Sequence, residues 1–112
     1  MCGIVGYTGN KPAQEIVMDS LKKLEYRGYD SSGIALHEGK LVFSKKEGPI
    51  ANLEKVLGTS DSKMGIAHTR WATHGVPSDV NSHPHLIKDG KIAVVHNGTI
   101  DNYLDIKASL EK

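Results

Sequence analysis

The sequence predicts an α+β fold, because runs typical of β-strands alternate with segments that have helical spacing. The clearest strand signal is the turn pair Asp89-Gly90, which joins the apolar runs 86–88 and 91–95 as a hairpin. The clearest helix signal is the recurrence of apolar residues at helical spacing over 13–24. No internal repeat or low-complexity tract interrupts the pattern, so we expect one domain.

The first half of the chain opens with a β-type run over 3–7, although its glycines weaken the strand signal. Pro12 then opens the helix, which we expect to end near Leu24. Residues 33–44 form a predicted hairpin, because the Glu38-Gly39 pair divides two runs with strand-like composition.

The second half begins with a short amphipathic helix over 50–57, ended by Gly58. A strand over 64–68 and a polar loop over 69–84 follow, before the second hairpin. Another helical pattern starts at Ile100 and runs to the last residue without a capping signal. Because the chain stops inside that pattern, we expect it to be a fragment of a longer domain.

Composition limits the classes of function. The chain has 112 residues, and its 14 lysines and arginines nearly balance 13 aspartates and glutamates, for a net charge of +1. A dedicated nucleic-acid binder would show a clear basic excess, so we expect no nucleic-acid partner. No apolar run approaches the roughly 20 residues that a membrane-spanning helix needs, so we expect no membrane partner either.

Cys2 is the single cysteine, so no internal disulfide can form. No signal-peptide pattern precedes it, and we therefore expect a reducing, cytoplasmic setting. Removal of Met1 would place a thiol and a free α-amine on the same residue. Their reference pKa values are about 8.5 and about 7.7–8.0, so the amine can take the thiol proton near neutral pH. Cys2 is therefore a candidate nucleophile with its own base; the alternative is a cysteine without a role.

A second candidate is the polar run 68–75 (HTRWATHG), which follows a predicted strand. Arg70 offers a planar pair of donors that can grip a carboxylate. Threonine, histidine and glycine add small hydrogen-bonding groups, as binding loops often do. The alternative is that Trp71 packs on the core while Arg70 pairs with a surface acid.

The third candidate is His96-Asn97-Gly98, between a predicted strand and a predicted helix. Asn-Gly is usually a plain turn. Beside a nucleophile, however, the Asn97 amide and the Gly98 N–H can converge on one oxygen and form an oxyanion hole.

Six histidines leave a metal site as a further alternative, with His83 and His85 as its first ligands. Two residues apart on a strand, both rings can point to the same side. A second cysteine, a helical His-x-x-x-His pair and clustered carboxylates are all missing from the sequence. A small metal-binding module therefore remains an alternative function.

Taken together, five motifs closely resemble the start of the glutamine–fructose-6-phosphate aminotransferase family. Related amidotransferases share the terminal Cys-Gly-Ile but lack the Arg-Trp-Ala-Thr-His-Gly run. The resemblance implies a class II glutamine amidotransferase domain with the N-terminal-nucleophile (Ntn) hydrolase fold, an αββα sandwich that is truncated here. The five motifs are residues 2–6 (CGIVG), 26–31 (YRGYDS), 68–75 (HTRWATHG), 81–85 (NSHPH) and 95–98 (VHNG).

The same resemblance implies catalytic roles at matching positions. Cys2, exposed by loss of Met1, would attack the side-chain amide of glutamine. Asn97 and the Gly98 N–H would stabilise the oxyanion of both tetrahedral intermediates. Ammonia would leave, and water would hydrolyse the remaining thioester to glutamate. Neither a metal nor an organic cofactor is implied.

Further positions are implied to bind the substrate. Arg70 would hold the glutamine α-carboxylate, with Thr73 and His74 completing that pocket. In the family this segment belongs to a mobile loop that covers glutamine, and Trp71 would gate the passage of ammonia. Closing such a site protects ammonia from protonation and loss to solvent.

Three other positions complete the implied site. Arg27 and Gly28 would lie near the nucleophile and help to orient its amine. His83 would lie near the boundary with the sugar-isomerase domain. We therefore expect residues 1–112 to be the first part of a glutaminase domain, and the Asp that binds the substrate amine in this family has no assigned position here.

The implied activity supplies ammonia for the conversion of fructose 6-phosphate to glucosamine 6-phosphate. Glutamine is the expected substrate, and fructose 6-phosphate would be bound by the absent sugar-isomerase region. We expect the full-length parent to be a homo-oligomer. An alternative is that the chain is an inactive truncated fragment, with unpaired strand edges and an uncovered sheet face that make it prone to aggregation.

Overall fold

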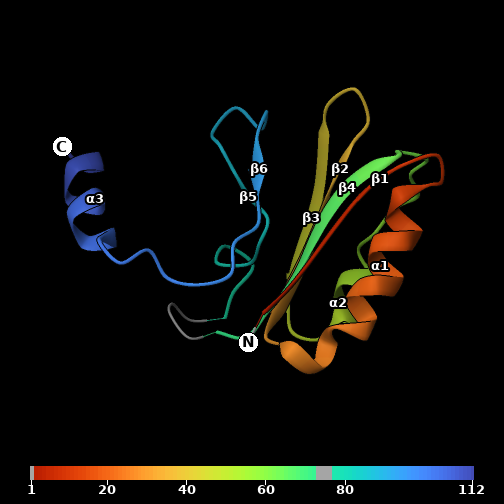
Figure 1. Ribbon diagram of the computed structural model, residues 1–112, viewed down its shortest axis with the longest axis horizontal. Coiled ribbons are helices and arrows are strands. Elements are labelled where there is room, and N and C mark those ends of the chain that lie inside the picture. Colours follow the sequence, from red (N-terminus) through yellow and green to blue (C-terminus); the bar gives the residue numbers. More distant parts are fainter. Residues whose placement is uncertain (1, 73–76) are drawn as a thin grey trace.

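The computed structural model describes residues 2–72 and 77–112. Four antiparallel strands form its main sheet in the order β1-β4-β2-β3 (Figure 1). β4 is the last of these four strands in the sequence, but it lies between β1 and β2. This order places the N-terminal strand beside β4, in which the polar run 68–75 begins. The strands are β1 (Gly3–Thr8), β2 (Ser31–His37), β3 (Leu41–Glu47) and β4 (Met64–Arg70).

Two helices, α1 (Ala13–Lys23) and α2 (Ile50–Glu54), cover one face of the sheet (Figure 1). Their apolar faces pack against alternate residues of β2 and β4, as the sequence periodicity predicts. Burying each large aliphatic side chain in such a core contributes about 1.5–3 kcal/mol. The core residues are Ala13, Val17, Met18, Leu21, Ile34, Leu36, Ile50, Leu53 and Ala67.

Glycines that weaken the strand signal at the sequence level have a packing role. A Cβ atom on Gly3 would lie 3.0 Å from the Leu24 Cβ, just after α1. One on Gly65, in β4, would lie 2.7 Å from the Leu36 Cδ2. The small residues therefore let helix and strand side chains approach the sheet closely, and the predicted strand at the N-terminus is confirmed as β1.

The opposite face of the sheet is less covered in the described part of the chain. Ile4 and Phe43, on the outer strands β1 and β3, are 43% and 49% exposed. The short hairpin of β5 (His85–Leu86) and β6 (Ala93–Val94) lies on this side, and α3 (Tyr103–Leu110) stands apart from the sheet (Figure 1). One helix layer and one four-stranded sheet of the expected sandwich are thus present.

Element boundaries differ from the predictions where tertiary pairing decides them. Thr69 and Arg70, which the sequence places in a loop, belong to β4 because β2 continues to pair with them through Ser31. The short helix α2 ends at Glu54 rather than near Leu57. The last helix starts three residues later than the apolar pattern, at Tyr103 in α3. No helix among the described residues is both long and apolar enough for a membrane crossing.

Candidate functional site

A cavity of about 650 Å³ opens where the end of β4 meets the N-terminus and the β5–β6 hairpin. It therefore lies on the face of the sheet away from α1 and α2. Segments from both ends of the chain line it, and positions singled out in the sequence are among the lining residues: Cys2, Arg70, Trp71, His83, His85, His96 and Gly98.

Cys2 is held at the mouth of this cavity by groups that are distant in the sequence. Its carbonyl oxygen accepts hydrogen bonds from Arg27 Nε and Asn97 Nδ2, both at 3.1 Å. Its Sγ lies 3.4 Å from the Trp71 backbone nitrogen, which donates to it, and 3.6 Å from the Trp71 carbonyl oxygen. Cys2 is thus positioned by contacts to three separate segments, of which Trp71 contacts the thiol itself.

Gly28 lets the loop after α1 lie directly against the end of β4. A Cβ atom at this position would be 2.5 Å from the Arg70 carbonyl carbon and 2.6 Å from the Trp71 nitrogen. The Gly28 backbone is extended, with φ at 174°, so the requirement is one of space and not of conformation. The Thr69 hydroxyl donates to the Gly28 carbonyl and closes this contact.

Asn97 connects Cys2 to the interior of the sheet. While its Nδ2 donates to the Cys2 carbonyl, its Oδ1 lies 2.8 Å from Nε2 of His68. Gly98 follows with φ at +121°, a conformation that residues with a side chain rarely adopt. Asn97 and Gly98 are therefore placed beside Cys2 by a turn whose second residue has to be glycine.

Arg70 is only 7% exposed, while Trp71 is 45% exposed and touches Tyr29 edge to face with ring centres 6.0 Å apart. Asp30 binds the backbone on both sides of this pair: its N–H donates to the Arg70 carbonyl at 2.9 Å, and its Oδ2 accepts the Ala72 N–H at 2.8 Å. The predicted binding residues Thr73 and His74 lie outside the described residues.

Three histidine rings lie in contact beside the cavity, which His83 and His85 line. The rings of His68 and His83 are 4.1 Å apart and nearly parallel, and His85 lies 4.3 Å beyond His83. Burial lowers the pKa of His68 to about 4 and that of His83 to about 3. Within residues 2–72 and 77–112 no group of three or more metal-ligating side chains is found.

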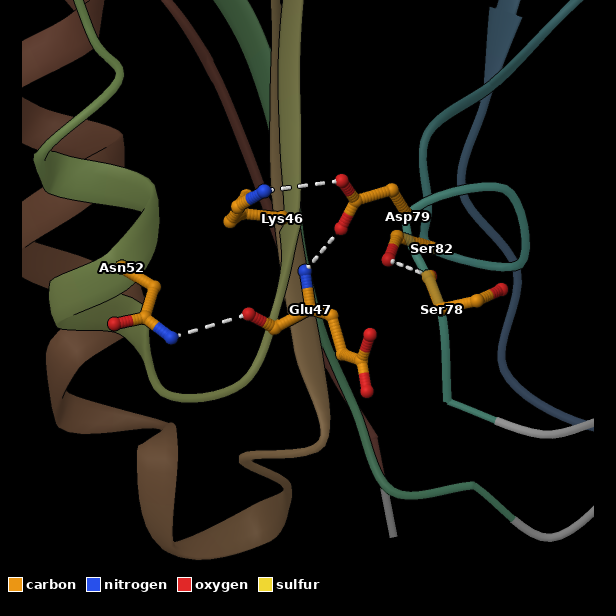
Figure 2. Close-up of polar contacts among 6 residues, drawn as sticks. All are labelled: Lys46, Glu47, Asn52, Ser78, Asp79 and Ser82. Atoms are coloured by element: carbon orange, nitrogen blue, oxygen red, sulfur yellow. Dashed lines mark hydrogen bonds and ion pairs between the residues drawn. The ribbon is translucent and has the colours of Figure 1, made fainter.

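The segment that carries His83 is fastened to the edge of the sheet. Figure 2 shows Asp79 between two groups of β3: its Oδ1 accepts the Glu47 N–H at 2.7 Å, and its Oδ2 pairs with Lys46 Nζ at 3.2 Å. Nearby, Lys45 Nζ donates to the Ser82 carbonyl at 3.0 Å. These contacts set the position of His83 relative to the sheet.

The chain is similar over almost its whole length to several curated proteins. It is 57% identical over 115 residues to the glutamine–fructose-6-phosphate aminotransferase (isomerizing) of Aquifex aeolicus. It is 53% identical over 121 residues to the enzyme of the same name from Mycolicibacterium smegmatis. These alignments cover 100% and 99% of this chain. By sequence, the chain is related to the glutamine–fructose-6-phosphate aminotransferases. It spans 19% of the length of each of these two relatives, and no protein-family model matches it.

Two solved structures share the fold of this chain. The glutamine phosphoribosylpyrophosphate amidotransferase of B. subtilis aligns over 99% of the chain with a TM-score of 0.84 and 30% identity. A structure described as the allosteric regulatory enzyme of purine biosynthesis aligns over 99% with a TM-score of 0.86 and 31% identity. The alignments cover 25% of each of those chains. The predicted Ntn amidotransferase fold is thereby confirmed.

Three residues that help to position the candidate site were not among the predicted site residues. His68 was part of a noted motif, but its contact with Asn97 joins residues 29 positions apart. Asp30 likewise belonged to a noted motif, 26–31, but had no role assigned to it, and Asp79 resembles an ordinary surface acid in the sequence. The strand pattern gives a partial signal that His68 faces the site. Neighbouring residues of a strand point to opposite faces of the sheet, and Ala67 of β4 faces the core, so His68 lies on the other face.

The stability of the folded chain should fall as the pH drops below about 6.5. For His68 the folded pKa of about 4 lies below the reference value of 6.5, because burial disfavours the charged ring. Between these values the unfolded chain binds more protons, so protonation favours unfolding by up to about 1.4 kcal/mol per pH unit for each such histidine. His83 contributes to the pH dependence in the same direction. Its contribution to the free energy of unfolding is smaller, because its ring is partly exposed and solvent screens the charge.

Urea unfolding between pH 7.5 and pH 5 measures this dependence above the range in which carboxylates titrate. His68→Gln should flatten the profile, whereas His37→Gln at an exposed position should leave it unchanged. A profile that is flat from pH 7 to pH 5 in the unsubstituted protein would contradict the prediction.

Proposed function

We propose that this chain forms the nucleophile and oxyanion-binding part of a site that hydrolyses the side-chain amide of glutamine. The observation that carries the proposal is the convergence of Arg27 and Asn97 on the carbonyl of Cys2, beside a cavity that the Cys2 thiol borders. Kinship with aminotransferases whose names specify glutamine supports the choice of substrate.

In the proposed reaction the Cys2 α-amine, freed by removal of Met1, accepts the thiol proton. The sulfur then forms a bond to the amide carbon, and the electron pair of the C=O bond moves to oxygen. As the oxyanion collapses, the C–N bond breaks and the amine returns its proton to the departing ammonia. Water then attacks the thioester, which releases glutamate and restores the thiol.

The oxyanion needs donors that are in place before charge develops. Asn97 Nδ2 is the first proposed donor, since it lies 3.1 Å from the Cys2 carbonyl and both neighbours of Asn97 in the chain, His96 and Gly98, line the cavity. The N–H of Gly98 is the second proposed donor, and its positive φ supports a turn that follows the cavity wall. The two groups need little rearrangement to face an oxygen bound next to the thiol.

We assign the substrate α-carboxylate to Arg70, which lines the cavity and is largely buried. A buried guanidinium is well suited to bind a carboxylate because less water competes for its donors. Thr73 and His74 are proposed to complete that pocket, and Trp71 to gate the exit of ammonia. Arg27 and Gly28 orient Cys2, and His83 is proposed to face the boundary with a second domain.

The activity of the complete protein follows as a wider proposal. Residues 1–112 would be the first part of a glutaminase domain, and a further region would use the ammonia to convert fructose 6-phosphate to glucosamine 6-phosphate. The names of the relatives support this transfer, and the share of their length that the chain spans leaves room for such a region.

Intact mass before and after incubation with 6-diazo-5-oxo-norleucine, an electrophilic glutamine analogue, tests the proposal. The expected result is loss of Met1 followed by a single adduct mapped to Cys2, the single cysteine. Glutamine in excess should protect against labelling. If the complete protein loses Met1 and forms no adduct, the proposed nucleophile is wrong; an adduct in the complete protein but not in residues 1–112 would make this chain an inactive fragment.

A further inference from the structure

His68 is a fully buried polar residue, and the hydrogen bonds described for its side chain all go to the turn at residues 96–98, which carries the proposed oxyanion donors. Its side chain is 0% exposed, and it lies at the centre of the sheet, where β4 pairs with both β1 and β2. Its Nε2 is 2.8 Å from Asn97 Oδ1 and 3.2 Å from the His96 carbonyl oxygen. The ring thus contacts two consecutive residues of the turn that carries the proposed oxyanion donor.

The hydrogen-bond partners determine which atoms carry protons. The Cys2 carbonyl can only accept, so the end of the Asn97 amide that faces it must be the NH₂ group. The other end of the amide is then the oxygen, which also only accepts. Since the His96 carbonyl accepts as well, Nε2 of His68 must carry the proton.

From this geometry we infer that His68 is a positioning residue for glutamine hydrolysis: as a neutral Nε2–H donor it holds the Asn97 amide with its NH₂ group toward Cys2. The inference rests on the proposed function. A rotation of the amide by half a turn would put its oxygen next to the developing oxyanion and its NH₂ group against the His68 N–H. Both contacts would be repulsive, so His68 disfavours the unproductive orientation.

The surroundings keep the ring itself in place and neutral. Ring stacking with His83, at 4.1 Å, covers one face of His68, and the paired strands on either side restrict its backbone. Nδ1 has no hydrogen-bond partner among the described residues, as suits the lone pair of the Nε2–H form. Burial lowers the pKa to about 4, so the ring remains a neutral donor at neutral pH.

Two substitutions separate donor placement from simple packing. Glutamine at position 68 places an amide N–H near the site of the imidazole Nε2, whereas asparagine reaches only to the site of Nδ1. In the complete protein, His68→Asn should lower kcat for glutamine hydrolysis by about 10- to 100-fold with KM changed less than about threefold. His68→Gln should keep kcat within about fivefold of the parent, since one donor is retained.

A mimic of the tetrahedral intermediate provides a second measurement. The affinity for this mimic would not change selectively if His68 had only a structural role. The aldehyde analogue of glutamine forms a carbon–sulfur bond to Cys2; the thiol proton ends on the former carbonyl oxygen, which takes the place of the oxyanion. Its Ki should weaken in His68→Asn by about the same factor as kcat falls, while the affinity for glutamate stays nearly unchanged. Alkylation of Cys2 by iodoacetamide, which forms no oxyanion, should proceed at the parent rate.

If the parent hydrolyses glutamine, two results would overturn the inference about His68. One is an equal loss of kcat in both variants, and the other is no loss of kcat in a folded His68→Asn variant. A parent that does not hydrolyse glutamine would instead overturn the proposed function. Nitrogen-15 NMR of ring-labelled histidine in the unsubstituted protein decides the matter even if the variants unfold. A neutral Nε2–H form for His68 is expected at pH 7, and an Nδ1–H or charged ring would contradict it.

Discussion

Replacing Cys2 by alanine is expected to abolish glutamine hydrolysis, with kcat reduced by at least about 10⁴-fold, because the proposed route has no other nucleophile. The folded state should be little affected. Cys2 is only partly buried, and its hydrogen bonds to Arg27 and Asn97 use its backbone carbonyl, which alanine retains. Ammonia release from glutamine and the melting temperature of the complete protein measure the two effects.

A second variant tests whether the amine of Cys2 is the base. One residue inserted between Met1 and Cys2 so that Met1 is retained keeps the thiol but moves the free amine away from it. Activity should be lost here as well, while iodoacetamide still labels the thiol. Normal turnover by the extended protein would rule out the amine as base, and normal turnover by Cys2→Ala would rule out the nucleophile.

Replacing Asn97 by alanine is expected to lower kcat by about 10²- to 10³-fold, the usual effect of removing one oxyanion donor. The KM for glutamine should change much less, because the amide contacts the oxygen most strongly once charge develops on it. Some loss of stability should accompany the change, since Nε2 of buried His68 loses its shorter hydrogen bond. Steady-state kinetics and thermal unfolding of the complete protein report both quantities.

Asn52 offers a matched control for this substitution. Its amide also donates to a backbone carbonyl, that of Glu47 at 3.2 Å (Figure 2). Asn52 belongs to α2, however, and does not line the cavity. Asn52→Ala should leave both kcat and KM at the parent values. A pure KM effect in Asn97→Ala would make Asn97 a residue that binds the ground state of the substrate and not the oxyanion.

Local patterns were enough to predict most elements of this fold. The helix over 13–24 and the hairpin around Glu38-Gly39 appear close to their predicted places, as α1 and the β2–β3 pair. Boundaries were wrong where pairing partners extend an element, as at Thr69 and Arg70. A strand ends where its neighbours stop pairing with it, and no local sequence signal reports that.

Motifs likewise indicated which residue types belong to the site but not how they contact one another. Cys2, Arg70 and Asn97 are recognisable because their chemistry suits a nucleophile, a carboxylate-binding cation and an oxyanion donor. The role of His68 was not predicted, because its partner is 29 residues away and lies on a turn beyond the β5–β6 hairpin.

Short-range periodicity and turn signals are enough to predict the α+β class, and residue identities at fixed spacing indicate the family and the candidate nucleophile. The assembly of the site depends on long-range contacts. Gly3 pairs with Thr69 when β1 adds to β4, and this register places Cys2 against Trp71, 69 residues away, and within reach of Asn97, 95 residues away. Such contacts arise from strand order and close packing, which are properties of the whole chain and not of any one segment.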